Sequence, residues 1–152
     1  NNLPTSQTNL DYSQSDFEFT PRDNIFVNKD VVINAIGNPD FIILNSLTAD
    51  IHEGQNPRYG RRGKIPGSIN IPFHELLDNK TGKFKPIEEL ANMFEKNKIT
   101  KDKKILNYCG GGIAASLEAF VLYQLGFEKI VIYDNSLHEW AAIDQTLPME
   151  NN

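Results

Sequence analysis

The segment NYCGGG, residues 107–112, contains the only cysteine of the chain, Cys109, followed directly by three glycines. Glycines permit backbone conformations that turn several successive N–H groups toward one point. A helix that begins near Ala114 would add the positive end of its dipole at the same place. Such a setting stabilises a thiolate, which can act as a nucleophile or a sulfur carrier, and its N–H groups can receive an anion. We therefore interpret Cys109 as a nucleophile in an anion-binding loop.

The alternative interpretation is that Cys109 is a packing residue and that the glycines only make a tight turn. Free cysteine is among the most buried residue types, which favours this alternative for a lone cysteine. Here a predicted strand end, a glycine run and a predicted helix start coincide, which favours the reactive thiol. Cysteine phosphatase chemistry is disfavoured, because those enzymes hold phosphate with an arginine six positions after the cysteine. Ala115 stands at that position, and no arginine follows Arg62.

The elements that position this loop follow from the apolar pattern of the chain. Short continuous apolar runs predict buried strands at residues 41–44, 68–71, 104–108 and 130–133. Apolar residues at helical spacing predict helices through Val31, Val32, Ala35 and Ile36, through Ile87, Leu90, Ala91 and Phe94, and through Leu117, Phe120, Val121 and Leu125. Alternating strands and helices predict right-handed βαβ units and a mostly parallel sheet. Sites in such sheets lie beyond the carboxyl ends of the strands, where Cys109 stands.

Local signals predict where these helices begin and end. Asn28 is a candidate N-cap, and Gly37 and Gly126 are candidate stops. Pro86 suits a first helical turn. The segment SLHE, residues 136–139, is a capping-box pattern that opens a last short helix carrying Trp140.

The composition is that of a soluble globular protein, with 39% hydrophobic and 23% charged residues. No apolar run approaches the ~20 residues that span a membrane, and the net charge of −5 disfavours a general nucleic-acid binder. We therefore expect neither nucleic acid nor a membrane as a partner. One cysteine cannot form an internal disulfide, and we favour a cytoplasmic over a periplasmic location.

The chain is long enough for one domain with a substantial core. Residues 1–20 are polar and predict an arm or linker that docks at most through Phe17 and Phe19. Residues 21–148 are the predicted domain, opened by Pro21, and residues 149–152 are a tail. The chain starts without methionine, so we expect a processed protein or a fragment of a longer one.

Two groups of charged or titratable residues remain. Four basic residues occur within seven positions, namely Arg58, Arg61, Arg62 and Lys64. They either steer an anionic donor toward Cys109 or form a solvated loop, and Arg58 is the best single candidate for binding. The three histidines, His52, His74 and His138, are scattered without ligand spacing, so we expect no metal site.

Three segments carry a resemblance to a known family. CGGGIA, residues 109–114, resembles the six-residue active-site loop of rhodanese-family sulfurtransferases, which begins with cysteine and has glycine at its fourth position. GKIPGSINIP, residues 63–72, is similar to the family's G-H-I-P-G-A-x-N-I-P segment, and YDNSLHEW, residues 133–140, resembles its Y-D-G-S-W-x-E-W segment. The resemblance covers roughly residues 21–148 and is to the catalytic second domains of tandem thiosulfate or 3-mercaptopyruvate sulfurtransferases.

The resemblance implies an α/β fold of three layers, with a mostly parallel five-stranded sheet flanked by helices, and no metal or organic cofactor. It implies that Cys109 takes a sulfane sulfur from a donor such as thiosulfate or 3-mercaptopyruvate and passes the resulting persulfide sulfur to cyanide or a thiol. The binding groups it implies are the amides of Gly110, Gly111, Gly112, Ile113 and Ala114 and the side chain of Arg58. Its implied partners are a small anionic donor, a thiol or cyanide acceptor, and a preceding inactive rhodanese domain or a sulfur-acceptor protein.

The sequence departs from the family pattern in the residues that would bind a donor. Asn45-Ser46-Leu47 stands where the family has Asp-x-Arg, and Ile51 stands where mercaptopyruvate enzymes have a first substrate arginine. Gly110 and Gly111 replace the charged loop residues of thiosulfate enzymes, and Gly111 and Ala114 replace the hydroxyls of mercaptopyruvate enzymes. These departures support a second interpretation, a rhodanese-like module that binds or relays sulfur for a partner with little turnover of free small donors.

Overall fold

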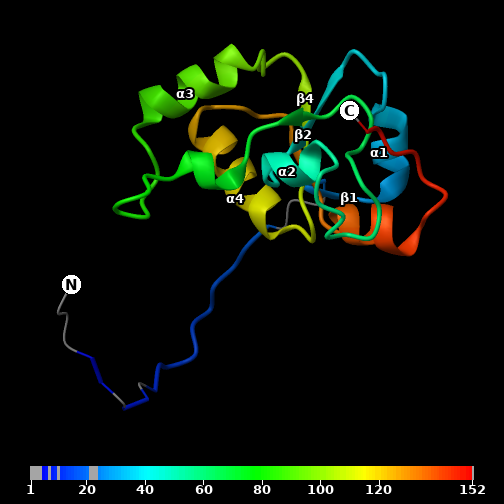
Figure 1. The fold of residues 1–152 in the computed structure, drawn as a ribbon. Helices are drawn as coiled ribbons and strands as arrows, with labels where there is room; N and C mark the ends of the chain where they lie inside the picture. The colour runs from blue at the N-terminus through cyan, green and yellow to red at the C-terminus, as the bar shows by residue number, and fades with distance from the viewer. Residues whose placement is uncertain (1–4, 7, 10, 21–23, 152) are drawn as a thin grey trace.

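The computed structural model describes residues 5–6, 8–9, 11–20 and 24–151 (Figure 1). Residues 11–20 are exposed, form no helix or strand, and run away from the domain as an extended segment in Figure 1. The predicted start of the domain at Pro21 lies outside the described residues. No helix within the described ranges is long and apolar enough to cross a membrane.

Five parallel strands form one sheet in the order β1-β5-β4-β2-β3. Their bounds are β1 Phe26–Val27, β2 Phe41–Asn45, β3 Ile69–Asn70, β4 Lys104–Tyr108 and β5 Ile130–Tyr133. The predicted α/β class and the four predicted strands are confirmed, with the strand at 68–71 reduced to two residues. The residues gave no signal for β1, because a two-residue strand is too short to carry an apolar pattern.

Helices cover both faces of the sheet. Their bounds are α1 Lys29–Ala35, α2 Ala49–His52, the 3₁₀ segment η1 Phe73–Leu76, α3 Ile87–Lys96, α4 Ile113–Gln124 and the π-helical segment η2 His138–Ile143. Figure 1 shows α3 and α4 on one side of the strands and α1 with the orange η2 on the other. Successive side chains of a strand point to opposite faces of the sheet, so alternate residues of the central strands belong to two separate hydrophobic cores.

Four helix predictions are confirmed in position and partly wrong in detail. Asn28 caps α1 through its side chain, as predicted. The sequence did not predict α2, because a single helical turn in a polar loop has no apolar stripe. In α3 the residues Ile87 and Ala91 are exposed, although they belong to the predicted apolar stripe. In α4 the predicted core residue Phe120 is 51% exposed.

The face that α4 buries differs from the predicted one because the helix is apolar on most sides. Its composition gives little preference for one face, so the tertiary contacts choose which residues are covered. The helix packs against β4, β5 and η1 and buries the small residues Ala115 and Ala119 together with Glu118. A buried glutamate on this helix was not expected from the sequence.

The capping-box prediction at Ser136 is wrong. Ser136 has a positive φ of 51° and makes no side-chain cap for η2. Its hydroxyl donates to the carbonyl of Tyr133 at 2.7 Å and accepts from the N–H of Cys109 at 3.0 Å. The serine therefore ties the end of β5 to the cysteine loop.

The C-terminal residues pack against the domain near Gly63. Lys64 and Glu150 pair through two backbone hydrogen bonds of 3.0 and 2.9 Å, and a carboxylate oxygen of Glu150 accepts from the N–H of Gly67 at 2.7 Å. Gly63 has a φ of 100°, and a Cβ there would overlap the Glu150 carbonyl oxygen. The close approach of the two backbones therefore requires glycine at this position.

Gly63→Ala is expected to lower the free energy of unfolding by about 2 to 3 kcal/mol, because it adds left-handed strain and displaces the C-terminal segment. Gly37→Ala is the matched control, because Gly37 has a φ of 74° but an added Cβ there would meet nothing within 4 Å. It should cost only the strain of about 1 to 2 kcal/mol. Urea unfolding of both variants measures the difference, and equal losses would contradict the role assigned to the Gly63–Glu150 contact.

Candidate active site at the carboxyl end of β4

Cys109 follows the last residue of β4 and is clamped by the start of η2. Its N–H donates to the hydroxyl of Ser136 at 3.0 Å, and its carbonyl accepts from the N–H of Leu137 at 3.1 Å. The carbonyl of Gly110 accepts from the N–H of His138 at 3.0 Å. These three bonds fix the backbone of the first two residues of the loop, from which the thiol projects.

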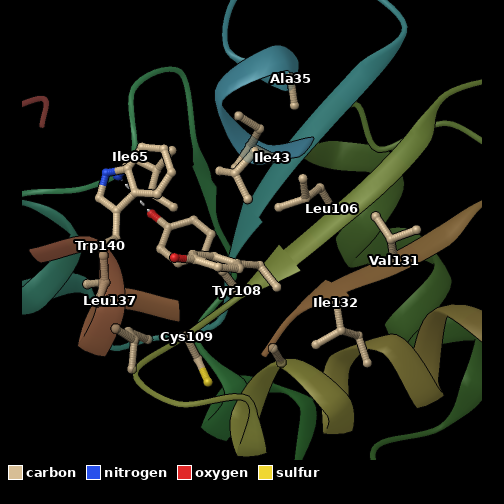
Figure 2. Close-up of a cluster of buried hydrophobic side chains, with 14 of the residues drawn as sticks. Ala35, Ile43, Ile65, Leu106, Tyr108, Cys109, Val131, Ile132, Leu137 and Trp140 are labelled. Carbon is tan, nitrogen blue, oxygen red and sulfur yellow. Dashed lines mark hydrogen bonds between the residues drawn. The ribbon is translucent and has the colours of Figure 1, made fainter. Parts of the chain in front are cut away.

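The thiol is both buried and adjacent to a pocket. Cys109 is 2% exposed and belongs to the core that contains Tyr108, Leu137 and Trp140. Figure 2 shows it at the edge of this core, with its sulfur directed away from Tyr108 and Trp140. The same residue lines an open pocket of about 650 Å³. Cys109 therefore packs in the core and also borders the pocket, so the two interpretations of the sequence do not exclude each other.

Tyr108 anchors the segment that precedes the cysteine. Its hydroxyl accepts from the N–H of Ile65 at 3.2 Å and lies 3.0 Å from the hydroxyl of Ser68. Complete burial raises the pKa of Tyr108 well above its usual value, so this hydroxyl stays neutral. The bonds join the 63–72 segment to the end of β4, directly before Cys109, and Figure 2 shows Ile65 and Tyr108 side by side.

The three glycines of the loop have different surroundings. A Cβ at Gly110 would overlap the hydroxyl of Tyr59, whereas a Cβ at Gly111 would meet nothing within 4 Å. Gly112 has a φ of 82°, and a Cβ there would overlap a carboxylate oxygen of Asp134. Gly112 also stands at the N-cap position of α4, so its left-handed backbone turns the loop into the helix.

The pocket beside Cys109 gathers most of the predicted binding residues. Predicted residues in its lining are Arg58, Cys109, Gly110, Gly111, Ile113 and Ala114. Gly112 does not line it and acts through the backbone turn. Leu47 and Ile51 also line the pocket, and both stand where the family pattern has an arginine. The other lining residues were not predicted as site residues from the sequence, and they are Thr48, Tyr59, Phe73, Leu77, Leu117 and His138. Thr48 lies just after β2, and this position could have identified it.

Of the four clustered basic residues, only Arg58 borders the pocket. The guanidinium of Arg61 donates to four backbone carbonyls between residues 140 and 147, at 2.5 to 3.4 Å. Arg62 donates to the carbonyls of Gly54 and Gln55, and Lys64 lies 3.3 Å from a carboxylate oxygen of Glu150. Arg61, Arg62 and Lys64 therefore hold the 58–64 loop in place, which does not fit a freely solvated loop, and the steering of an anionic donor by the cluster stays a prediction.

Residues 39–143 match the family described as rhodanese-like domain. The chain belongs to the rhodanese family. This rhodanese domain is 36% identical over 125 residues to "Thiosulfate/3-mercaptopyruvate sulfurtransferase 1, mitochondrial" of Arabidopsis thaliana, and the match covers 80% of the chain and 32% of that protein. It is 36% identical over 99 residues to the 3-mercaptopyruvate sulfurtransferase of Escherichia coli K12, and the match covers 64% of this chain and 34% of that protein. It is 42% identical over 95 residues to the sulfur carrier protein TtuD of Thermus thermophilus, and the match covers 60% of this chain and 33% of that protein.

The rhodanese domain thus spans about a third of the length of the curated relatives it matches.

Solved structures agree on the fold. The anaerobic ergothioneine biosynthesis enzyme from Chlorobium limicola superimposes with a TM-score of 0.78 at 19% identity, covering 86% of this chain and 33% of that one. Wild-type EanB superimposes with a TM-score of 0.76 at 20% identity, and the match covers 84% of this chain and 32% of that one.

The Asn45-Ser46-Leu47 segment of this rhodanese domain is buried and hydrogen-bonded. The side-chain amide of Asn45 lies 3.1 Å from Nδ1 of His52 and its oxygen accepts from the N–H of Leu47 at 3.0 Å. Burial lowers the pKa of His52 to about 4, so the imidazole is neutral near pH 7. Neutral Asn45 and apolar Leu47 therefore stand where the family pattern has two charges, and the neutral imidazole of His52 lies against the Asn45 amide.

A buried carboxyl group lies one helical turn beyond Ala114. Glu118 is fully buried, and its Oε2 accepts from the hydroxyl of Ser46. Burial raises the pKa of Glu118 to about 8, so this group is neutral near pH 7. The first turn of α4 also contains no acidic residue. The first turns of α4 therefore contribute no negative charge at the loop, although the carboxylate of Asp134 lies beside Gly112 at the N-cap position.

No metal-binding group of three or more His, Cys, Asp or Glu residues occurs within the described ranges. The polar groups at the pocket include the thiol of Cys109, the N–H groups of the loop and the guanidinium of Arg58.

Proposed function

We propose that this rhodanese domain transfers sulfane sulfur through a persulfide on Cys109. The observation that carries the proposal is the position of the thiol, which follows β4, precedes the 12-residue helix α4 and lines a pocket of about 650 Å³. The names of the relatives, thiosulfate and 3-mercaptopyruvate sulfurtransferases, support the same reaction class. Because the chain spans only part of those proteins, their activity is a proposal for this one.

The proposed reaction has two displacements at sulfur. The thiolate of Cys109 attacks the sulfane sulfur of the donor, and the bond between that sulfur and the rest of the donor breaks with its electron pair on the leaving group. An acceptor thiolate or cyanide then attacks the outer sulfur of the persulfide and regenerates the Cys109 thiolate. The N–H groups of residues 110–114 and the N-terminus of α4 would stabilise the negative outer sulfur.

A second candidate is a sulfur-relay module that receives sulfur from a partner and turns over free small donors slowly. The observation that favours it is the sparse charge of the pocket, where Arg58 is the permanently charged residue among the described lining residues. Neutral Asn45 and buried Leu47 stand where the family has a charged pair. A relative named as a sulfur carrier protein is consistent with this candidate.

Incubation of the protein with thiosulfate, and separately with 3-mercaptopyruvate, is expected to add the mass of one sulfur atom to the intact chain. Cyanide should remove that mass and release thiocyanate. The Cys109→Ser variant, in which the only thiol is replaced by a hydroxyl, is the control and should acquire no sulfur. Loading without thiocyanate turnover would favour the relay module, and no loading of Cys109 by either donor would contradict the enzyme proposal.

A further inference from the structure

The walls of the pocket beside Cys109 are mostly apolar. Leu47, Ile51, Phe73, Leu77 and Leu117 line it together with Tyr59 and Ile113. Ile113 is 85% exposed at the start of α4 and presents its side chain at the loop. An apolar ligand surface that enters this pocket would leave water without losing hydrogen bonds, which is favourable in proportion to the area buried.

The positive charge available to a ligand in the pocket is small. Among the described lining residues, only Arg58 carries a permanent charge, and its guanidinium lies 5.8 Å from the centre of the Tyr59 ring. Arg61, Arg62 and Lys64 are held elsewhere by carbonyls and by Glu150. One guanidinium matches one anionic group, whereas a small dianion would lose strong hydration for a single cation.

The geometry of the loop leaves no room for a side chain at Gly110. The Tyr59 hydroxyl occupies the space that a side chain at Gly110 would need. The present position of Tyr59 therefore requires glycine at residue 110, and an arginine or lysine there would require Tyr59 to move. Gly111 has open space beside it, so the loop leaves room for a ligand larger than an inorganic anion.

We infer that this pocket selects sulfur donors that have an apolar body and a single anionic group, in preference to inorganic thiosulfate. The inference rests on the proposed function and specifies the donor class for the same site. The apolar body lies against Tyr59, Phe73 and Leu77, and the anionic group faces Arg58.

An organic thiosulfonate, R–SO₂–S⁻, is a donor with this chemistry. The Cys109 thiolate attacks the outer sulfur, the S–S bond to the sulfonyl sulfur breaks, and its electron pair leaves on the sulfinate R–SO₂⁻. Cys109 then carries the persulfide anion. The step conserves charge and needs no proton, oxidant or reductant from outside.

The sodium salts of benzenethiosulfonate and methanethiosulfonate, with thiosulfate alongside, test the inference. The rate of sulfur loading on Cys109 is followed by intact mass and divided by the rate of the same donor with free N-acetylcysteine, which removes intrinsic reactivity. The phenyl donor is expected to exceed the methyl donor by about tenfold or more, the range that added apolar groups give in apolar pockets. Thiosulfate should be the slowest of the three.

Matched variants test whether the preference for the phenyl donor comes from contacts in the pocket or from apolar surface elsewhere on the protein. Phe73→Ser should reduce the phenyl-to-methyl ratio toward one, and Phe73→Leu should reduce it less. Phe120→Ser is the control, because Phe120 lies on the exposed side of α4 in a different groove. It should keep the wild-type ratio. Arg58→Gln should slow both organic donors by the same factor, since both carry one charge.

The outcomes distinguish this inference from the proposed function. A phenyl-to-methyl ratio near one, faster loading by thiosulfate, or an unchanged ratio in folded Phe73 variants would overturn the inference while the persulfide reaction stands. An Arg58→Gln variant with wild-type loading would overturn the role of the anionic group. If no donor loads Cys109, the proposed function fails and this inference fails with it.

Discussion

Gly112→Ala is expected to lower the rate of sulfur loading on Cys109 about 100-fold, because displacement of reacting groups by about 1 Å has effects of that size. Gly112 turns the loop into α4 with a φ of 82°, and a Cβ would overlap a carboxylate oxygen of Asp134. An alanine must therefore either hold a strained left-handed backbone or move the loop. The left-handed strain and the displaced aspartate should also lower the free energy of unfolding by about 2 kcal/mol or more.

The matched control is Gly82→Ala, which lies outside the cysteine loop. Gly82 also has a positive φ, of 66°, but a Cβ added there would have nothing within 4 Å, so the variant carries the left-handed strain without a clash. Intact-mass loading rates and urea unfolding should separate the two variants clearly. Loading by Gly112→Ala at the wild-type rate would show that the left-handed turn is not needed to position the thiol.

Glu118 is expected to make the protein less stable as the pH rises from acid values toward about 8. Its pKa is raised by burial from 4.5 to about 8, so between these values the folded state keeps a proton that the unfolded state has released. Each pH unit in that window then lowers the free energy of unfolding by about 1.4 kcal/mol. Between pH 6.5 and 8 the loss should be roughly 2 kcal/mol. In Glu118→Gln this loss should disappear, because the amide cannot ionise.

Urea unfolding from pH 6.5 to 9 measures this slope. The lower limit excludes His52, whose pKa is lowered from 6.5 to about 4 and whose contribution to stability is therefore lost as the pH falls below 6.5. Glu95→Gln makes the same substitution at an exposed position of α3 and should keep the wild-type slope. Equal slopes in the wild type and Glu118→Gln would mean that Glu118 is already ionised in the folded protein.

The neutral state of Glu118 also bears on the proposed chemistry. The carboxyl group lies one turn into α4, whose N-terminus would stabilise the persulfide. Ionisation would place a negative charge in the same part of the helix. If loading of Cys109 slows above pH 8 in the wild type and not in Glu118→Gln, this electrostatic link is supported.

The amino-acid sequence by itself determined the features that depend on local pattern. The apolar runs identified β2, β4 and β5, and the glycines after Cys109 identified a loop between a strand and a helix. Asn28 capped the helix that its position predicted. These signals could be read because a buried strand, a helix stripe and a cap are each specified by residues only a few positions apart.

Only the tertiary structure decided which side chains surround the thiol. Tyr59 lies against Gly110 and Asp134 against Gly112, although each pair is distant in the sequence. The same holds for Ser136, which accepts from the Cys109 N–H instead of capping a helix, and for Arg58, which alone of its cluster borders the pocket. These contacts depend on the order of strands in the sheet and on how the loops pack over its edge. Residue spacing along the chain does not encode that arrangement.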